Sequence, residues 1–191
     1  MHIDTRTANL LGAAALSVTD LMVSGTTAAA KVSPSGTAAL VALSEAPGLT
    51  VTELGRRVGL SQSASARMID SLEAAGYVTR SSGPGRWVAV GLTEAGQQAA
   101  RGLLAARAES LAGVLGALNE GEQAELARLL ARLLDRLHGE IRSCEVICRL
   151  CDRAACTSSA ACPVGQAERD RQAERDRQAD QDPRTETGRR R

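Results

Sequence analysis

The chain has 191 residues with 23 Lys and Arg against 22 Asp and Glu, so no overall charge draws it to nucleic acid or a membrane. Aromatic residues make up only 1%, which excludes stacking surfaces for single-stranded nucleic acid and disfavours an aromatic ligand pocket. No apolar run approaches the roughly 18 residues of a membrane span, and the first residues do not resemble a signal peptide. We therefore expect a cytoplasmic protein with no membrane partner.

The first segment, residues 1–31, is apolar and rich in alanine. Its leucines recur at helical spacings between Thr7 and Ala30, which predicts a helix that ends near Gly25 or just beyond. A break over residues 31–36 precedes a short helix from Thr37 to Ser44.

Two short helices separated by a tight turn are predicted next. Thr50 and Glu53 form a capping-box pattern at the start of the first helix, and Gly59 ends it. Ser61 is placed to cap a second helix over residues 62–75.

The apolar period then changes from that of a helix to that of a strand. Residues 77–80 and 86–90 alternate between polar and apolar side chains, and the turn-rich residues 81–85 join them into a β-hairpin. Helix, turn, helix and hairpin in this order predict a winged helix-turn-helix over residues 32–98, in a mainly α, α+β fold.

Two long leucine-rich helices follow. The first starts at Thr93 and carries a leucine stripe over 103–118, and the second starts after the capping box of Asn119 and Glu122. The winged domain is too small to cover these stripes, so we assign residues 1–31 and 99–143 to a homodimer interface. The alternative is a helical bundle within one chain.

The second helix of the winged domain is predicted to read DNA. One face is apolar, and the opposite face with the flanking arginines gives the candidate DNA-binding residues Ser61, Gln62, Ser63, Ala66, Arg67, Arg56 and Arg57. Gln62 and Arg67 are long enough to reach base edges, and the helix start favours a phosphate near Ser61. Residues 56–92 hold five arginines and two acids, so the positive charge of a nearly neutral chain is concentrated here.

The stretch LTVTELGRRVGLSQSASARMIDSLEAAGYVTR, followed by RWVAVGLTEAGQ, resembles the MarR family of bacterial transcriptional regulators over about residues 49–98. The resemblance implies a DNA-binding regulator, which we expect to be a repressor, and makes Arg86 the wing arginine that enters the minor groove. A single winged domain makes too few base contacts for a unique site, so we expect a homodimer on a palindromic operator in double-stranded DNA. A small-molecule effector is compatible with this function and is not identified by the sequence.

All five cysteines fall within nineteen residues of the segment 144–165. Cys144, Cys148 and Cys151 continue the stripe of the last leucine-rich helix, so we expect them on one face of a single helix. A break at residues 157–159 would let Cys156 and Cys162 fold back, and four sulfurs could then face one point. This arrangement could bind zinc or an iron–sulfur cluster, or act as a thiol redox switch. The alternative is that the cysteines only pack as small apolar residues. In the sensing hypothesis, cluster gain or loss orders or frays the last dimerisation helix.

The tail, residues 166–191, is charged and has no large apolar residue, so we expect it to be disordered or to form a solvated helix. No catalytic triad, phosphate loop or carboxylate pair is present, so we do not expect an enzyme. His138 is interpreted as a solvated helix residue. The alternative function is a metal- or thiol-dependent protein-interaction module that does not bind DNA.

Overall fold

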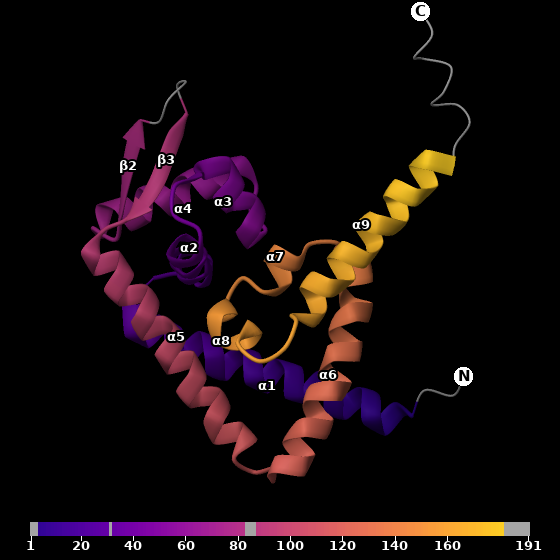
Figure 1. The fold of residues 1–191 in the computed structure, drawn as a ribbon. Helices are drawn as coiled ribbons and strands as arrows, with labels where there is room; N and C mark the ends of the chain where they lie inside the picture. Colours follow the sequence, from indigo (N-terminus) through magenta and orange to yellow (C-terminus); the bar gives the residue numbers. More distant parts are fainter. Residues whose placement is uncertain (1–3, 31, 83–86, 182–191) are drawn as a thin grey trace, which may run out of the picture.

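The computed structural model describes residues 4–30, 32–82 and 87–181, and places a small winged domain beside long helices (Figure 1). Along the chain the elements are α1 Thr5–Ala30, α2 Pro34–Glu45, β1 Leu49–Thr50, α3 Val51–Val58, α4 Gln62–Ala74, β2 Val78–Ser82, β3 Val88–Leu92, α5 Glu94–Leu115, α6 Glu120–Ile141, α7 Cys144–Ile147, α8 Arg153–Thr157 and α9 Pro163–Gln181. This is the predicted mainly helical fold with a winged helix-turn-helix.

The winged domain has the predicted helix caps. Thr50 and Glu53 form the capping box of α3, Gly59 ends that helix in the left-handed conformation at φ 75°, and Ser61 caps α4. The strands of the hairpin are shifted from the predicted residues 77–80 and 86–90 to residues 78–82 and 88–92, and Val78 pairs with Leu92 in an antiparallel register. The two-residue strand β1, which the sequence analysis missed, pairs with the other side of β3.

One hydrophobic core joins the winged domain to the first half of α5. Its fully buried side chains come from α2, α3, α4, β3 and α5, and include Leu40, Leu54, Ile69, Val90 and Leu103. The core therefore fixes α4, the helix predicted to read DNA, relative to the first half of α5.

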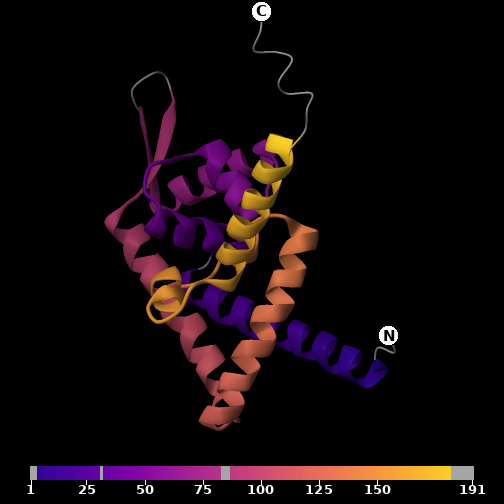
Figure 2. The same cartoon turned by 45° about the vertical axis from the view of Figure 1, so that its right-hand side comes forward.

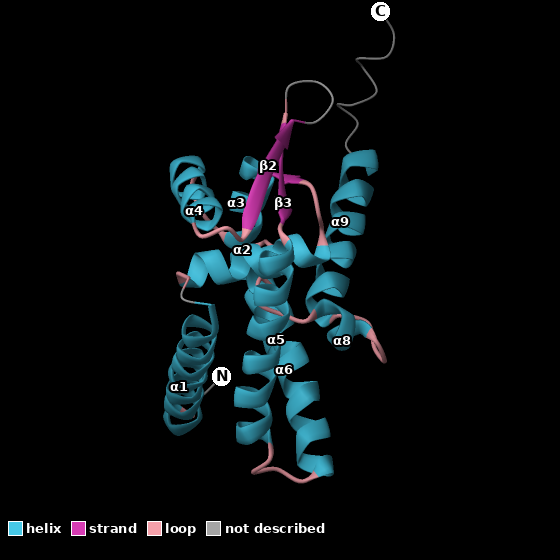
Figure 3. Cartoon of the chain, turned by 90° about the vertical axis from the view of Figure 1, so that its left-hand side faces the viewer, coloured by secondary structure: helices cyan, strands magenta, loops and turns pink. Residues whose placement is uncertain are grey.

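Helix α1 packs against α5 of its own chain, and α5 and α6 diverge like the arms of a V from a turn at the end opposite the hairpin (Figures 1 and 3). Residues Thr5–Gly25 of α1 have a mean hydropathy of 1.3, and by length and composition alone they could cross a membrane. The prediction that no segment approaches a membrane span is wrong on this criterion. A single such helix near the N-terminus is weak evidence for a membrane protein, and this one also carries Arg6 and Asp20.

The prediction that Cys144, Cys148 and Cys151 extend the last leucine-rich helix is wrong. Helix α6 ends at Ile141 because Arg142 adopts a left-handed conformation, with φ 56° and ψ 27°. The chain then turns, and Ser143 caps the single-turn helix α7 by accepting a hydrogen bond from the Val146 N–H at 3.2 Å.

The charged tail is helical through Gln181, so of the two predicted states the described part adopts the helix and is not disordered. Helix α9 packs along α6, burying Val164 and Ala167 near its start (Figure 2). The interpretation of His138 as solvated is wrong: the residue is 2% exposed, and its Nε2 lies 2.5 Å from Oε2 of Glu168 on α9. Residues 182–191 of the tail lie outside the described part of the chain.

Candidate nucleic-acid interface and cysteine cluster

The start of α4 presents most of the predicted base-reading side chains to solvent. Gln62, Ser63 and Arg67 are exposed, Ala66 is half-buried, and the opposite face of α4 is buried in the core. Ser61 is also exposed, and its Oγ accepts a hydrogen bond from the Ala64 N–H at 3.4 Å. In the described part of the chain Arg67 makes no ion pair, so its guanidinium is available to a base edge or a phosphate.

Arg80 on β2, one of the five arginines of residues 56–92, is paired with two carboxylates of α4. Its Nη2 donates to Oδ1 of Asp70 at 2.6 Å, and its Nη1 bonds the carboxylate of Glu73. The hydrogen bond to Asp70 raises the pKa of Arg80. These contacts attach the first wing strand to α4 and offset one of the two negative charges on the exposed surface of that helix, which would otherwise repel phosphate.

Arg56 and Arg57 on α3 both pair with Glu145, a residue of α7 that sequence reasoning did not single out. Arg56 Nη1 lies 2.6 Å from Glu145 Oε2, and Arg57 Nε lies 3.3 Å from Oε1. The Arg56 side chain remains 65% exposed, whereas those of Arg57 and Glu145 are 24% and 19% exposed. Since Glu145 is 89 residues from Arg56 along the chain, no local sequence pattern could reveal the pair.

The cysteine segment also touches the winged domain through α2. The Arg153 N–H donates to Oε1 of Glu45 at 3.1 Å, and Arg153 Nε lies 3.6 Å from Oε2. Burial raises the pKa of Glu45. Leu150 packs against the hydrophobic core. The segment is therefore docked on both α2 and α3, the helices that support α4.

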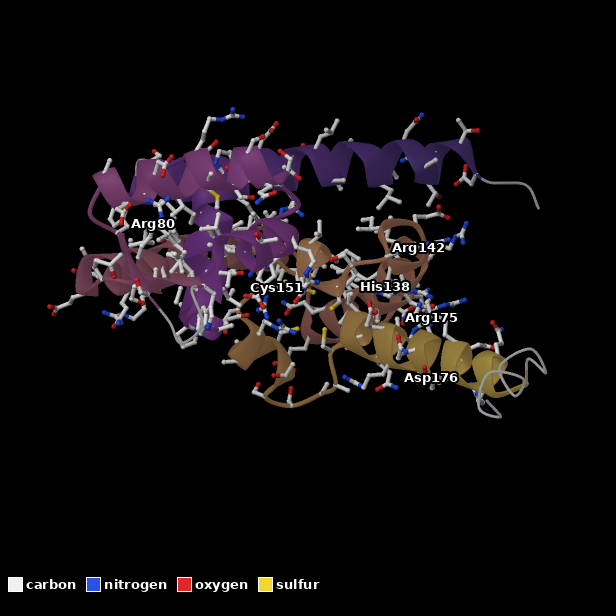
Figure 4. All side chains as sticks on the ribbon, turned by 90° about the horizontal axis from the view of Figure 1, so that it is seen from above. Arg80, His138, Arg142, Cys151, Arg175 and Asp176 are labelled. Carbon is white, nitrogen blue, oxygen red and sulfur yellow. The ribbon has the colours of Figure 1, made fainter. Side chains whose placement is uncertain are left out.

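Four of the five cysteines interact with one another in this segment. The Cys151 thiol, burial and the Cys162 thiol raise the pKa of Cys148, and burial together with the Cys162 thiol raises the pKa of Cys156. The Cys148 thiol lowers the pKa of Cys151 to about 6, although burial opposes it. All five thiols are free. Seen from above, Cys151 lies between the winged domain and α9 (Figure 4).

Cys144 does not belong to this group. Burial raises its pKa, and the neighbouring charges that act on it are those of Glu168, Glu145 and Arg153, with no other cysteine among them. Cys144 lines a cavity of about 440 Å³ together with Arg56 and Arg142. Of the five cysteines predicted as one set, Cys144 is therefore separate from the other four.

The thiols are close together without yet having the geometry of a metal centre. Among the described residues, no three His, Cys, Asp or Glu side chains stand in an arrangement that could hold a metal ion. A positive charge lies nearby, since Arg107 on α5 and Arg153 both favour the Cys151 thiolate. The Arg107 Nε is buried and finds no hydrogen-bond partner among the residues that the structure describes. Arg86, the predicted wing arginine, lies outside the described residues.

Comparisons with known proteins agree on one family. A sequence model of the MarR family matches residues 32–86. A probable transcriptional regulator from Pseudomonas aeruginosa is 30% identical with a TM-score of 0.55, and the match covers 69% of this chain and 99% of that one. The YusO protein of Bacillus subtilis is 25% identical with a TM-score of 0.60, over 70% of this chain and 97% of its own.

The PcaV transcriptional regulator of Streptomyces coelicolor is also similar, with 27% identity and a TM-score of 0.54 over 67% of this chain and 97% of its own. No curated protein matches the sequence. The match to the family model ends before the cysteine segment. With the winged domain, the helix order and these likenesses in agreement, the chain belongs to the MarR family of winged helix-turn-helix transcriptional regulators.

Proposed function

We propose that this protein is a sequence-specific repressor that binds a palindromic operator as a homodimer in the cytoplasm. The observation that carries the proposal is the exposed start of α4, where Gln62, Ser63 and the unpaired Arg67 stand on a rigid apolar core. In this fold the start of the second helix enters the major groove, and the first helix crosses the phosphate backbone. We assign that backbone role to Arg56 and Arg57 on α3.

Exposed leucines support the homodimer. Helices α1 and α6 leave large apolar side chains in solvent, namely Leu10, Leu11, Leu16, Leu21, Leu129, Leu130, Leu133, Leu137 and Ile141, each at least 41% exposed. So large an apolar surface is uncommon on a monomer, and a second copy of the chain would cover it and set the spacing between two α4 helices. The same dimer explains why α1 is apolar without placing it in a membrane.

The test starts from an operator selected out of a random duplex library, with affinity measured over a series of salt concentrations. The Arg67→Ala variant should lose about 1–3 kcal/mol of discrimination at one base position of each half-site. Arg86→Ala should weaken binding to all sequences more uniformly. Arg128→Ala, on the exposed α6 surface near the turn remote from the hairpin, is the matched control and should bind as the wild type does.

Wild-type base preference in both Arg67→Ala and Arg86→Ala would refute the assigned DNA face. A protein that selects no duplex, and binds DNA without steep salt dependence, would instead favour the interaction module that does not bind DNA.

We further propose that the regulator responds to a metal, an iron–sulfur cluster or thiol oxidation through its cysteine segment. The support is the docking of that segment on α2 and α3 through Glu45 and Glu145. A small-molecule effector is a compatible second input, because a cavity of about 490 Å³ lies between α2, α5 and α8.

A further inference from the structure

We propose that Cys148, Cys151, Cys156 and Cys162 form a four-thiolate site for a metal centre, either one zinc ion or an iron–sulfur cluster, and that its loading is sensed at α3 through Glu145. The metal site stands on its own evidence, whereas the link to α3 rests on the proposed DNA-binding function. As each metal–sulfur bond forms, the thiol gives its proton to solvent.

The backbone brings the four thiols together from three short pieces of chain. Cys148 and Cys151 flank a tight turn closed by the Cys151 N–H, which donates to the Cys148 carbonyl at 2.9 Å. Cys156 lies in α8, and Cys162 immediately precedes α9. The thiols are near enough to act on one another: Cys151 and Cys162 both raise the pKa of Cys148, and Cys162 raises that of Cys156. Among the described residues no three of these side chains yet stand as metal ligands, so the short helices α7 and α8 must move to draw the sulfurs to one point.

The surroundings of the thiols suit a negatively charged metal centre. Four thiolates around Zn²⁺ carry a net charge of −2, and Arg107 and Arg153 supply opposite charge beside Cys151. The buried Arg107 Nε has no hydrogen-bond partner within the described part of the chain. The Gly165 N–H lies 3.5 Å from Cys162 Sγ and donates to it, as backbone N–H groups do to the sulfur ligands of metal centres.

Small apolar packing does not explain this arrangement. Cys156 is exposed, and Cys148, Cys151 and Cys162 are only half-buried, whereas cysteines that serve as core residues are among the most fully buried side chains. The four thiols also satisfy the ligand count of a closed structural site without Cys144.

Glu145 connects the site to the DNA-binding helices. It lies three residues before Cys148 and holds both Arg56 and Arg57. A metal that fixes Cys148 and Cys151 also fixes α7, so Glu145 then competes with DNA phosphates for the two arginines more effectively. The metal-loaded protein is therefore expected to bind its operator more weakly than the metal-free protein.

The experiment uses the full chain purified without oxygen. Iron, sulfide and zinc are quantified and the visible spectrum is recorded; the metal-free protein is then titrated with Zn²⁺ and Co²⁺, or reconstituted with ferrous iron and sulfide. The four variants Cys148→Ser, Cys151→Ser, Cys156→Ser and Cys162→Ser are compared with Cys144→Ser as the matched control. Circular dichroism establishes that each variant is folded.

Support for the site is one centre per chain that survives Cys144→Ser and is weakened at least about tenfold by each of the other four substitutions. A tetrahedral Co²⁺ spectrum with bound zinc identifies the zinc form, and iron with acid-labile sulfide identifies the cluster. Loss of the centre in Cys144→Ser, wild-type binding in the folded four variants, or no metal uptake by either route overturns the site.

The link to α3 is tested separately by operator affinity with and without bound metal. Weaker binding by the loaded protein, abolished in Glu145→Gln, supports the link, and an effect of equal size in Glu145→Gln overturns it. Metal uptake is measured without DNA, so failure of the site leaves the proposed repressor intact. Failure to bind DNA likewise leaves the metal result standing.

Discussion

Replacing Glu145 with glutamine should make the protein bind its operator more tightly. The substitution keeps the size of the side chain and removes the charge that holds Arg56 at 2.6 Å and Arg57 at 3.3 Å. Both arginines lie on the helix that crosses the DNA backbone in this fold, so each becomes available to a phosphate.

The size of the effect follows from the exposure of the pair. The Arg56 side chain is 65% exposed, so solvent screens its interaction with Glu145, and the two ion pairs together cost DNA binding about 0.5–1 kcal/mol in each subunit. Two subunits bind one operator, so the operator affinity should rise about 5- to 30-fold. Extra phosphate contacts should also make the salt dependence steeper.

The assay is fluorescence anisotropy with the selected operator at several salt concentrations. Glu125→Gln is the control, because it removes a carboxylate that pairs at 2.6 Å with Arg128 on α6, away from the winged domain. The free energy of unfolding is measured alongside, to show that the variant is folded. Unchanged operator affinity and an unchanged salt slope in Glu145→Gln would refute the argument that Glu145 competes with DNA.

Three further substitutions test the fold that supports this site. Gly55→Ala should destabilise the protein by about 1–3 kcal/mol in urea unfolding, since a Cβ on α3 would overlap the buried Ser65 of α4; wild-type stability would show that the two helices are less closely packed. Leu133→Glu should give monomers by light scattering and lose operator binding, whereas Arg132→Glu, beside it but off the stripe, should remain dimeric. His138→Ala should release α9, seen as faster hydrogen exchange along that helix, and unchanged exchange would show that the histidine does not hold it.

The winged domain could be predicted because each of its elements carries local signals. Capping residues at Thr50 and Ser61 mark the starts of α3 and α4, and the change from helical to alternating apolar spacing marks the hairpin. Base-reading side chains follow from the same periodicity, because the apolar face of α4 must turn inward and leaves Gln62 and Arg67 outside.

The end of α6 could not be predicted in this way. The apolar spacing continues from Ile141 to Cys144 without a glycine or proline, and the helix ends instead at Arg142 in a left-handed conformation that costs a non-glycine residue energy. One local and one distant contact follow this residue: Ser143 caps α7, and Glu145 reaches α3 across 89 residues of chain. The burial of His138 was missed for the same reason, because its partner Glu168 lies 30 residues further on.

The position of α9 determines how a change at the cysteines can spread. The cysteine segment begins where α6 ends and returns to α9, which lies against the same helix α6, so both of its ends are anchored side by side. His138 bonds Glu168, and Arg171 donates to the Asp135 carbonyl at 3.0 Å, which fastens the start of α9 to α6. A loop closed at both ends cannot accommodate metal binding by sliding at its termini. Between these ends the segment contacts α2 through Glu45 and α3 through Glu145. Movement of α7 and α8 therefore changes the contacts of these two residues, on helices that pack against α4.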